Sequence, residues 1–402
     1  MLIGIKSFFA TTFRDYIDTM KDKQKRMNKY NILDVVKVQL RSLRDGSKKV
    51  EEFSRDPILR YASTGNISYW TSKIIDYDVY HQVFKKAITP EANTVHGRSI
   101  AIDGTVISLH MKNSLGLNKA SVTVCSLLDM NKGTFIDYNI AENCNEHDGL
   151  KQQMHLLTRN DVLVGDRNYG KPGLMGYLYD SVKFIFRVSH SLTMSKKFLK
   201  LNKRSAIVTY EDKKYKFIRY RVNKLTRNIV SEHHRNAGNA TQEDETTSEF
   251  LLCINDLTIA NDDAIKLYKG RWKIETNFKL LKSNFDIREP VKASNCKNPS
   301  KQINYNVGMS FALFNMTVDL QNESLVSDGR KPRFSRCASE VRNLCDKAIY
   351  GLLDDIVFSD LMIRLMRHLS NKPDIRQHGC RNHKRGRYKS KYRIECLNIE
   401  SQ

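Results

Sequence analysis

Three carboxylates stand where a protein could use them for metal-dependent chemistry. Asp103 falls in the strand-like run AIDGT, Asp166 closes the apolar run LVGD, and Glu275 falls in a helix-like stretch. Because polar groups near strand ends meet at one edge of a sheet, we expect these carboxylates to converge there. Mg²⁺ binds carboxylate oxygens and keeps several waters, so it needs few protein ligands. The set therefore predicts a site for two divalent cations that acts on phosphodiesters.

The stretch 267–286, LYKGRWKIETNFKLLKSNFD, adds a second pattern. Tyr268, Arg271, Glu275 and Lys282 stand at offsets 0, 3, 7 and 14. At about 100° per residue, a helix would place them within an arc of about 60°. A separate stripe of this helix is apolar: Leu267, Ile274, Phe278, Leu281 and Phe285. One face would pack while its neighbour presents a carboxylate between cations that can bind phosphates.

Each of these signals has an ordinary explanation when it is taken alone. A charged helix face is usually only solvated, and a lone aspartate near a strand end is more often a cap or turn residue. The combination of three carboxylates, in order, with a tyrosine and two cations is far more specific.

Charge points to a polyanionic partner. The chain of 402 residues has 67 Lys and Arg against 44 Asp and Glu, which gives a formal net charge of +23. Nucleic acid is the first candidate partner and an anionic membrane surface is the second. The eight cysteines are scattered without a CxxC pair, as in reduced proteins. With no signal peptide and no apolar run of membrane-spanning length, we expect an intracellular protein, cytoplasmic in a prokaryote or nuclear in a eukaryote.

Alternating elements predict an α/β fold with a mixed sheet flanked by helices. We expect strands in 98–109, 119–140 (two, with a turn at 131–133), 161–166, 182–189, 206–222 (one or two, turning near 212–213) and 249–257. We expect helices in 147–157, 171–180, 302–322 and 340–370. The stretch 267–286 would be the last helix that carries a site residue.

These elements suggest five regions. We expect a helical, DNA-binding region at 1–95, a catalytic core in two parts at 96–190 and 258–325, a β-rich insertion at 191–257, and a helical region at 326–402. Within the last region, 376–393 holds eight Lys or Arg and no acidic residue. Such a block is typical of an arm that binds phosphates, or of a solvated tail.

At these residues the chain resembles the DDE transposases of the IS-four family. Tyr268, Arg271, Glu275 and Lys282 match the family's Y-(2)-R-(3)-E-(6)-K signature. Asp103 in IDGT and Asp166 in GDRNYG match the contexts of its first two catalytic aspartates. The resemblance covers about residues 98–320 and leaves out both ends.

The resemblance implies an RNase H-like core with a β-rich insertion before the last catalytic helix. It implies that Asp103, Asp166 and Glu275 bind two Mg²⁺ or Mn²⁺ ions, and that Arg271, Lys282 and Tyr268 hold DNA phosphates. The implied activity is cut-and-paste DNA transposition. Water nicks the end of a DNA element, and the freed 3′-OH attacks the other strand or the target. The implied partners are double-stranded DNA, as terminal inverted repeats and target, and a second copy of the chain in a DNA-bound homodimer.

One departure concerns a flipped base, which some relatives stack on a tryptophan of the insertion. Both tryptophans here, Trp70 and Trp272, lie outside it, which leaves Tyr210, Tyr215 or Tyr220 as aromatic substitutes. Two other functions remain open. A domesticated or inactive derivative would bind DNA without cutting it, and an RNase H-like nuclease would cut without strand transfer.

Overall fold

The computed structural model describes residues 97–109, 120–141, 145–224, 246–285, 287, 299–324, 331–349 and 364–365. The predicted helical region at 1–95 and the arm at 376–393 lie outside these residues. Eight strands form one mixed sheet in the order β3-β2-β1-β4-β5-β8-β7-β6. The predicted α/β fold is therefore confirmed, and this mixed sheet with its flanking helices is consistent with an RNase H-like fold. The described residues divide into two compact units, one formed by those up to 161 together with those from 270 on, and the other by those between 162 and 269.

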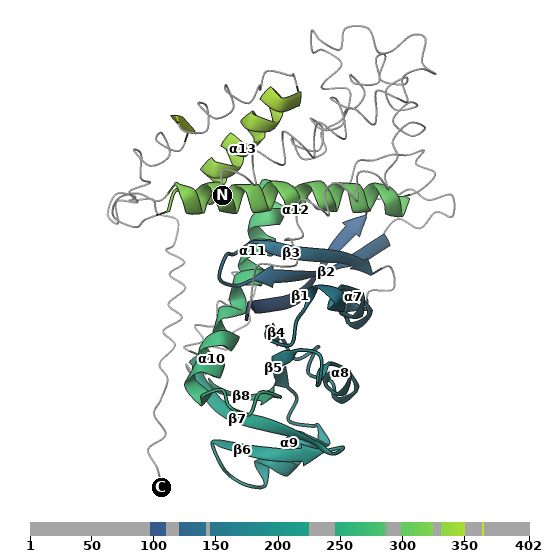
Figure 1. Cartoon of the computed structure of the whole chain (residues 1–402), viewed down its shortest axis with the longest axis vertical. Helices are drawn as coiled ribbons and strands as arrows, with labels where there is room; N and C mark the ends of the chain where they lie inside the picture. The colour runs from purple at the N-terminus through teal and green to yellow at the C-terminus, as the bar shows by residue number, and fades with distance from the viewer. Residues whose placement is uncertain are drawn as a thin grey trace, which may run out of the picture. The chain divides into compact units, whose positions relative to one another are not determined.

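The first unit contains the antiparallel strands β1 (Ser99–Leu109), β2 (Ala120–Asp129) and β3 (Phe135–Ala141). Its helical elements are α7 (Glu146–Gln153), η4 (Met154–Leu156), α11 (Trp272–Asn284), α12 (Pro299–Glu323) and α13 (Phe334–Ile349), and Figure 1 shows α11 and α12 in green beside these strands. The predicted turn between β2 and β3 forms because Asp129 Oδ1 accepts hydrogen bonds from the N–H groups of Asn131 and Lys132. Gly133 completes this turn with φ +80°, which favours glycine.

An aromatic cluster joins the sheet of the first unit to its helices. The Phe135 ring on β3 lies 5.6 Å from that of Phe278 on α11 and 4.5 Å from that of Phe311 on α12. Asn315 of α12 also bonds the backbone of Phe135 twice, accepting from its N–H at 2.8 Å and donating to its carbonyl at 2.7 Å. Because all four of these residues are buried, this cluster fixes α11 and α12 against the strands.

The second unit contains β4 (Val162–Gly165), α8 (Pro172–Leu178), β5 (Lys183–Val188), α9 (Thr193–Leu199), β6 (Ser205–Tyr210), β7 (Lys213–Lys224), β8 (Thr246–Ile254) and α10 (Asn261–Gly270). Strand β4 pairs with β5 in parallel, while β5, β8, β7 and β6 pair antiparallel. Within this unit, Figure 1 shows α10 and α8 on opposite sides of β5 and β8. Phe184 and Phe186 of β5 are fully buried, as expected for an inner strand covered on both faces.

Two details differ from the sequence-based expectations. The stretch 267–286 is not one helix, because α10 ends at Gly270 and α11 begins at Trp272. A side chain at position 270 would put its Cβ 2.6 Å from Met130 Cε, so this junction requires glycine unless Met130 moves. The short helix α9 was not predicted, because its seven residues are too few to show a clear helical period. Among the helices that the structure describes, none combines the length and the apolar character needed to cross a bilayer.

Candidate active site

The strand β1 places Asp103 on the face of the sheet toward α11. Successive strand residues point to opposite faces, so Asp103 and Gly104 face different helices. On the Gly104 face, the Glu146 side chain of α7 fills the space that a Cβ would occupy, with Oε1 2.1 Å from that position. On the other face, the Asp103 side chain is 17% exposed, and its Oδ1 accepts the Gly104 N–H at 2.9 Å. The IDGT sequence thus lets α7 approach closely behind the aspartate.

The helix α11 is anchored to the β2–β3 turn by its polar side chains. Lys273 Nζ donates to the carbonyl of Met130 at 2.7 Å, and Asn277 Nδ2 donates to that of Gly133 at 2.9 Å. On the packed face, Ile274 and Leu281 are fully buried. These contacts hold the helix in a fixed rotation, which directs Glu275 toward Asp103.

Arg271 joins two of the predicted site carboxylates, Asp103 and Glu275. Its Nη2 lies 2.6 Å from Glu275 Oε1, and its Nη1 lies 3.4 Å from Asp103 Oδ2. The arginine side chain is 11% exposed and that of Glu275 is 26% exposed, so the three charges are partly shielded from water. Asp103 from β1 and Arg271 and Glu275 from the start of α11 therefore form one cluster.

Asp166 lies in the second unit, on a tightly packed loop after β4. Its Oδ1 accepts the Asn168 N–H at 2.7 Å, which closes an Asx turn. Tyr169 is fully buried, with its ring 6.3 Å from that of Phe186. A Cβ on Gly170 would lie 2.2 Å from the Arg187 carbonyl oxygen. The GDRNYG sequence thus encodes a rigid loop that fixes the aspartate backbone.

The remaining predicted residues have different environments. Lys282 Nζ lies 3.5 Å from the carbonyl oxygen of Val106 on β1. Tyr268 is 9% exposed, and its ring meets that of Tyr220 edge-on at 6.4 Å. Among the tyrosines considered for base stacking, Tyr215 is only 2% exposed and is excluded because no base could reach its ring face. The ring of Tyr210 faces Lys197 Nζ at 6.0 Å.

The carboxylates of Asp103 and Glu275 fit a hard divalent cation. Asp103 and Glu275 present oxygen donors, and the guanidinium of Arg271 already occupies a cation position between them. Mg²⁺ is commonly held by one or two carboxylates together with substrate phosphates. Within the described residues, however, no group of three or more His, Cys, Asp or Glu side chains is gathered closely enough to hold a metal ion. The structure therefore shows a two-carboxylate cluster, and the third ligand stays a prediction.

One exposed residue beside the cluster was not singled out as a site residue. Trp272 is 57% exposed at the start of α11, and Lys279 Nζ lies 5.4 Å from the centre of its ring. The sequence could have indicated Trp272, because it stands about one turn before Glu275 and positions three apart share a helix face. A single exposed aromatic side chain is common on protein surfaces, so the place of Trp272 beside the cluster is not by itself evidence of a binding surface.

Comparison with known proteins identifies the segment that carries this cluster. Residues 96–292 match the family described as Transposase DDE domain. This segment is therefore similar to a transposase DDE domain. It contains all six predicted site residues, and the family is in general dependent on divalent metals, as the carboxylate chemistry suggests.

Comparison of whole chains adds little to this assignment. No curated protein matches the chain. Among solved structures it is similar to the piggyBac transposase in a synaptic complex with hairpin DNA, at 10% identity and a TM-score of 0.49, over 92% of this chain and 84% of that one. This likeness is too distant to carry a functional argument.

Proposed function

We propose that the chain is a DDE transposase of the IS-four family that cuts the ends of a DNA element and joins them to a target. The observation that carries the proposal is the cluster of Asp103 and Glu275 around Arg271, inside the matched domain. The spacing of Tyr268, Arg271, Glu275 and Lys282 supports the narrower family.

Asp103, Asp166 and Glu275 are the proposed metal ligands, for two Mg²⁺ or Mn²⁺ ions. When bound, the ions would activate the attacking oxygen and stabilise the leaving one. Asp103 and Glu275 would supply oxygens from a strand and a helix of the same unit, and the hydrogen bonds of α11 to the β2–β3 turn support a preorganised site. The loop after β4 would hold Asp166 with similar rigidity.

The cations of α11 are the proposed phosphate ligands. Arg271 directly precedes α11 and Lys282 lies on it, as Glu275 does, and an arginine fork can take two phosphate oxygens at once. Tyr268 is mostly buried, so its proposed contribution is limited to the small exposed part of its side chain. This arrangement would orient the scissile phosphate beside the carboxylates before cleavage.

The proposed partners are the terminal inverted repeats, the target DNA and a second copy of the chain. A net charge of +23 supports strong attraction to DNA. Two element ends must be held together for joining, which favours a DNA-bound homodimer. We expect the protein in the compartment that holds its DNA, the cytoplasm of a prokaryote or the nucleus of a eukaryote.

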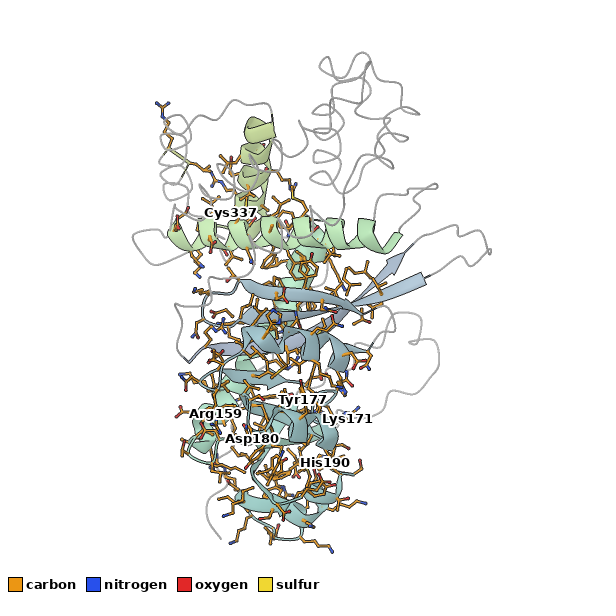
Figure 2. The ribbon with its side chains drawn as sticks, turned by 45° about the vertical axis from the view of Figure 1, so that its right-hand side comes forward. Arg159, Lys171, Tyr177, Asp180, His190 and Cys337 are labelled. Atoms are coloured by element: carbon orange, nitrogen blue, oxygen red, sulfur yellow. The ribbon has the colours of Figure 1, made fainter. Side chains whose placement is uncertain are left out.

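The test is cleavage of inverted-repeat DNA flanking the gene, in Mg²⁺ and in Mn²⁺. We expect the parent protein to cut at the element end, and Asp103→Asn, Asp166→Asn and Glu275→Gln each to lose at least about a hundredfold in rate. Asp180→Asn is the matched control, because this exposed carboxylate follows α8 (Figure 2) and is not one of the proposed metal ligands.

The products separate the alternatives. A joined product that contains target DNA supports a transposase, and cleavage without joining indicates a nuclease. Metal-independent binding with no cleavage in either metal would instead establish a DNA-binding derivative.

A further inference from the structure

Arg271 forms a split contact rather than a paired one. Each of its two terminal nitrogens reaches a different carboxylate, at 2.6 Å for Glu275 and 3.4 Å for Asp103. A guanidinium binds most strongly when both nitrogens meet the two oxygens of one acid group. The contact with Asp103 is also longer than an ordinary charge-assisted hydrogen bond. Each half of this bridge is therefore weaker than the paired contact that a single phosphate could offer.

The bridge also neutralises the oxygens that a metal would need. Two carboxylates and one guanidinium sum to a charge of −1, whereas the carboxylates alone would present −2 to a cation. The Arg271 side chain is 11% exposed and that of Asp103 is 17% exposed, so water screens these charges incompletely. A divalent cation entering the cluster would meet occupied oxygen lone pairs and a nearby positive charge.

We propose that Arg271 is a switch that couples metal binding to DNA binding. Without DNA, its guanidinium bridges Asp103 and Glu275 and competes with the divalent cation. A DNA phosphate, which can bind both guanidinium nitrogens, draws Arg271 away and frees the carboxylate oxygens for the metal. The inference rests on the proposed function, and it explains how a nuclease site could stay poorly loaded until DNA is in place.

Thermodynamic linkage makes the coupling measurable from both sides. If DNA raises the affinity for the metal by some factor, the metal must raise the affinity for DNA by the same factor. Arg271→Gln removes the bridge and its charge. We therefore expect this variant to bind metal in the absence of DNA with nearly the affinity that the parent reaches only with DNA.

The experiment measures Mn²⁺ binding to the full chain by electron paramagnetic resonance of the free ion. Without DNA, we expect Arg271→Gln to bind Mn²⁺ about tenfold more tightly than the parent, because a hydrogen bond between charged groups no longer competes. Adding inverted-repeat duplex, with its own Mn²⁺ binding subtracted, should tighten binding to the parent about tenfold and leave the variant little changed.

Two further variants separate the bridge from general charge. Lys282→Gln removes one positive charge from α11, the helix that follows Arg271, at a residue whose amino group lies 3.5 Å from the Val106 carbonyl oxygen. We expect it to change Mn²⁺ affinity much less than Arg271→Gln does. Arg271→Lys keeps the charge but lacks the fork, so its affinity should be intermediate. Because Arg271→Lys is the milder change, it replaces Arg271→Gln as the test variant if Arg271→Gln does not fold.

The proposal is overturned if removal of the arginine leaves Mn²⁺ affinity unchanged or weakens it, since Arg271 would then only organise the carboxylates. It is equally overturned if DNA does not change Mn²⁺ affinity in the parent. These readouts are independent of catalysis. Metal–DNA coupling in a protein that cuts no DNA would support the switch and contradict the proposed function, whereas cleavage without coupling would do the reverse.

Discussion

At the scale of single residues, one ion pair shows how burial changes the importance of a charge. Arg98, just before β1, makes three bonds to Asp161, just before β4: its N–H and Nε donate to Oδ1, and its Nη2 donates to Oδ2. The two side chains are 9% and 0% exposed. This pair lies at the start of β1, the strand that carries Asp103, and fixes the backbone there to the residue before β4.

Asp161 gives the protein a pH-dependent contribution to stability. Burial acts to raise the pKa of its carboxyl, but the hydrogen bonds from Arg98 and Thr158 outweigh burial and hold this pKa below its ordinary value. A group whose pKa is lower in the folded state stabilises that state above its unfolded pKa, and this stability is lost as pH falls through the folded pKa. We expect the free energy of unfolding to decline as pH falls below about 4.

Asp161→Asn should remove this dependence and cost about 3 kcal/mol at neutral pH, because it leaves the Arg98 charge buried without an anion. Asp262→Asn is the matched control, since its carboxylate is 87% exposed in its pair with Arg204 and should contribute less than about 1 kcal/mol. Urea unfolding at several pH values would measure both. Equal losses in the two variants would show that burial does not distinguish the pairs.

At the scale of elements, local sequence predicted more of the fold than of the site. The runs around β1, β5 and α12 were recognisable because apolar residues and turn residues alternate with clear periods. The break between α10 and α11 was not, because the apolar period continues across 267–286, and the close approach of Gly270 to Met130 joins residues that are distant in sequence. For the same reason, the spacing placed Arg271 near Glu275 but gave no indication that its side chain would also reach Asp103.

The loop that carries Asp166 offers a test of packing at this scale. Gly170→Ala would place a Cβ 2.2 Å from a backbone oxygen of β5, which cannot rotate away. We expect it to lower the free energy of unfolding by about 2 kcal/mol and to slow DNA cleavage, because the loop must shift. Gly173→Ala on α8 is the matched control. Its Cβ would meet nothing within 4 Å, and alanine is the better helix former, so stability should be unchanged or higher.

Thermal or urea unfolding of the two variants beside the parent would decide this prediction. If Gly170→Ala unfolds like the parent, the close approach of the loop to β5 is not a real constraint, and the glycine at the end of GDRNYG needs another explanation.

At the scale of the whole molecule, positive charge is distributed unevenly along the chain. Residues 181–210 contain seven Lys or Arg and no Asp or Glu. Lys196, Lys197 and Lys200 of this stretch are exposed on or next to α9, in the second unit. Exposed lysines are common, so their presence alone is not evidence of a DNA contact. Two of the seven cations pair with acids from elsewhere in the chain, Lys183 with Asp256 and Arg204 with Asp262. The lysines on or next to α9 are therefore the better candidates for a positive field that attracts DNA.

Salt dependence would show whether this stretch contacts DNA. Neutralising each DNA phosphate releases counterions, so affinity falls with a slope of about 0.9 in log–log units per contact, and a protein with many contacts loses about a thousandfold between 50 and 200 mM salt. We expect Lys196→Gln with Lys200→Gln to reduce the slope by about 1 to 2.

Lys151→Gln with Lys331→Gln removes the same charge from exposed sites elsewhere, and should weaken binding slightly without changing the slope. Fluorescence anisotropy with a labelled duplex across a salt series measures both. If the two double variants give the same slope as the parent, α9 adds only long-range attraction, and the phosphate contacts must come from other parts of the chain.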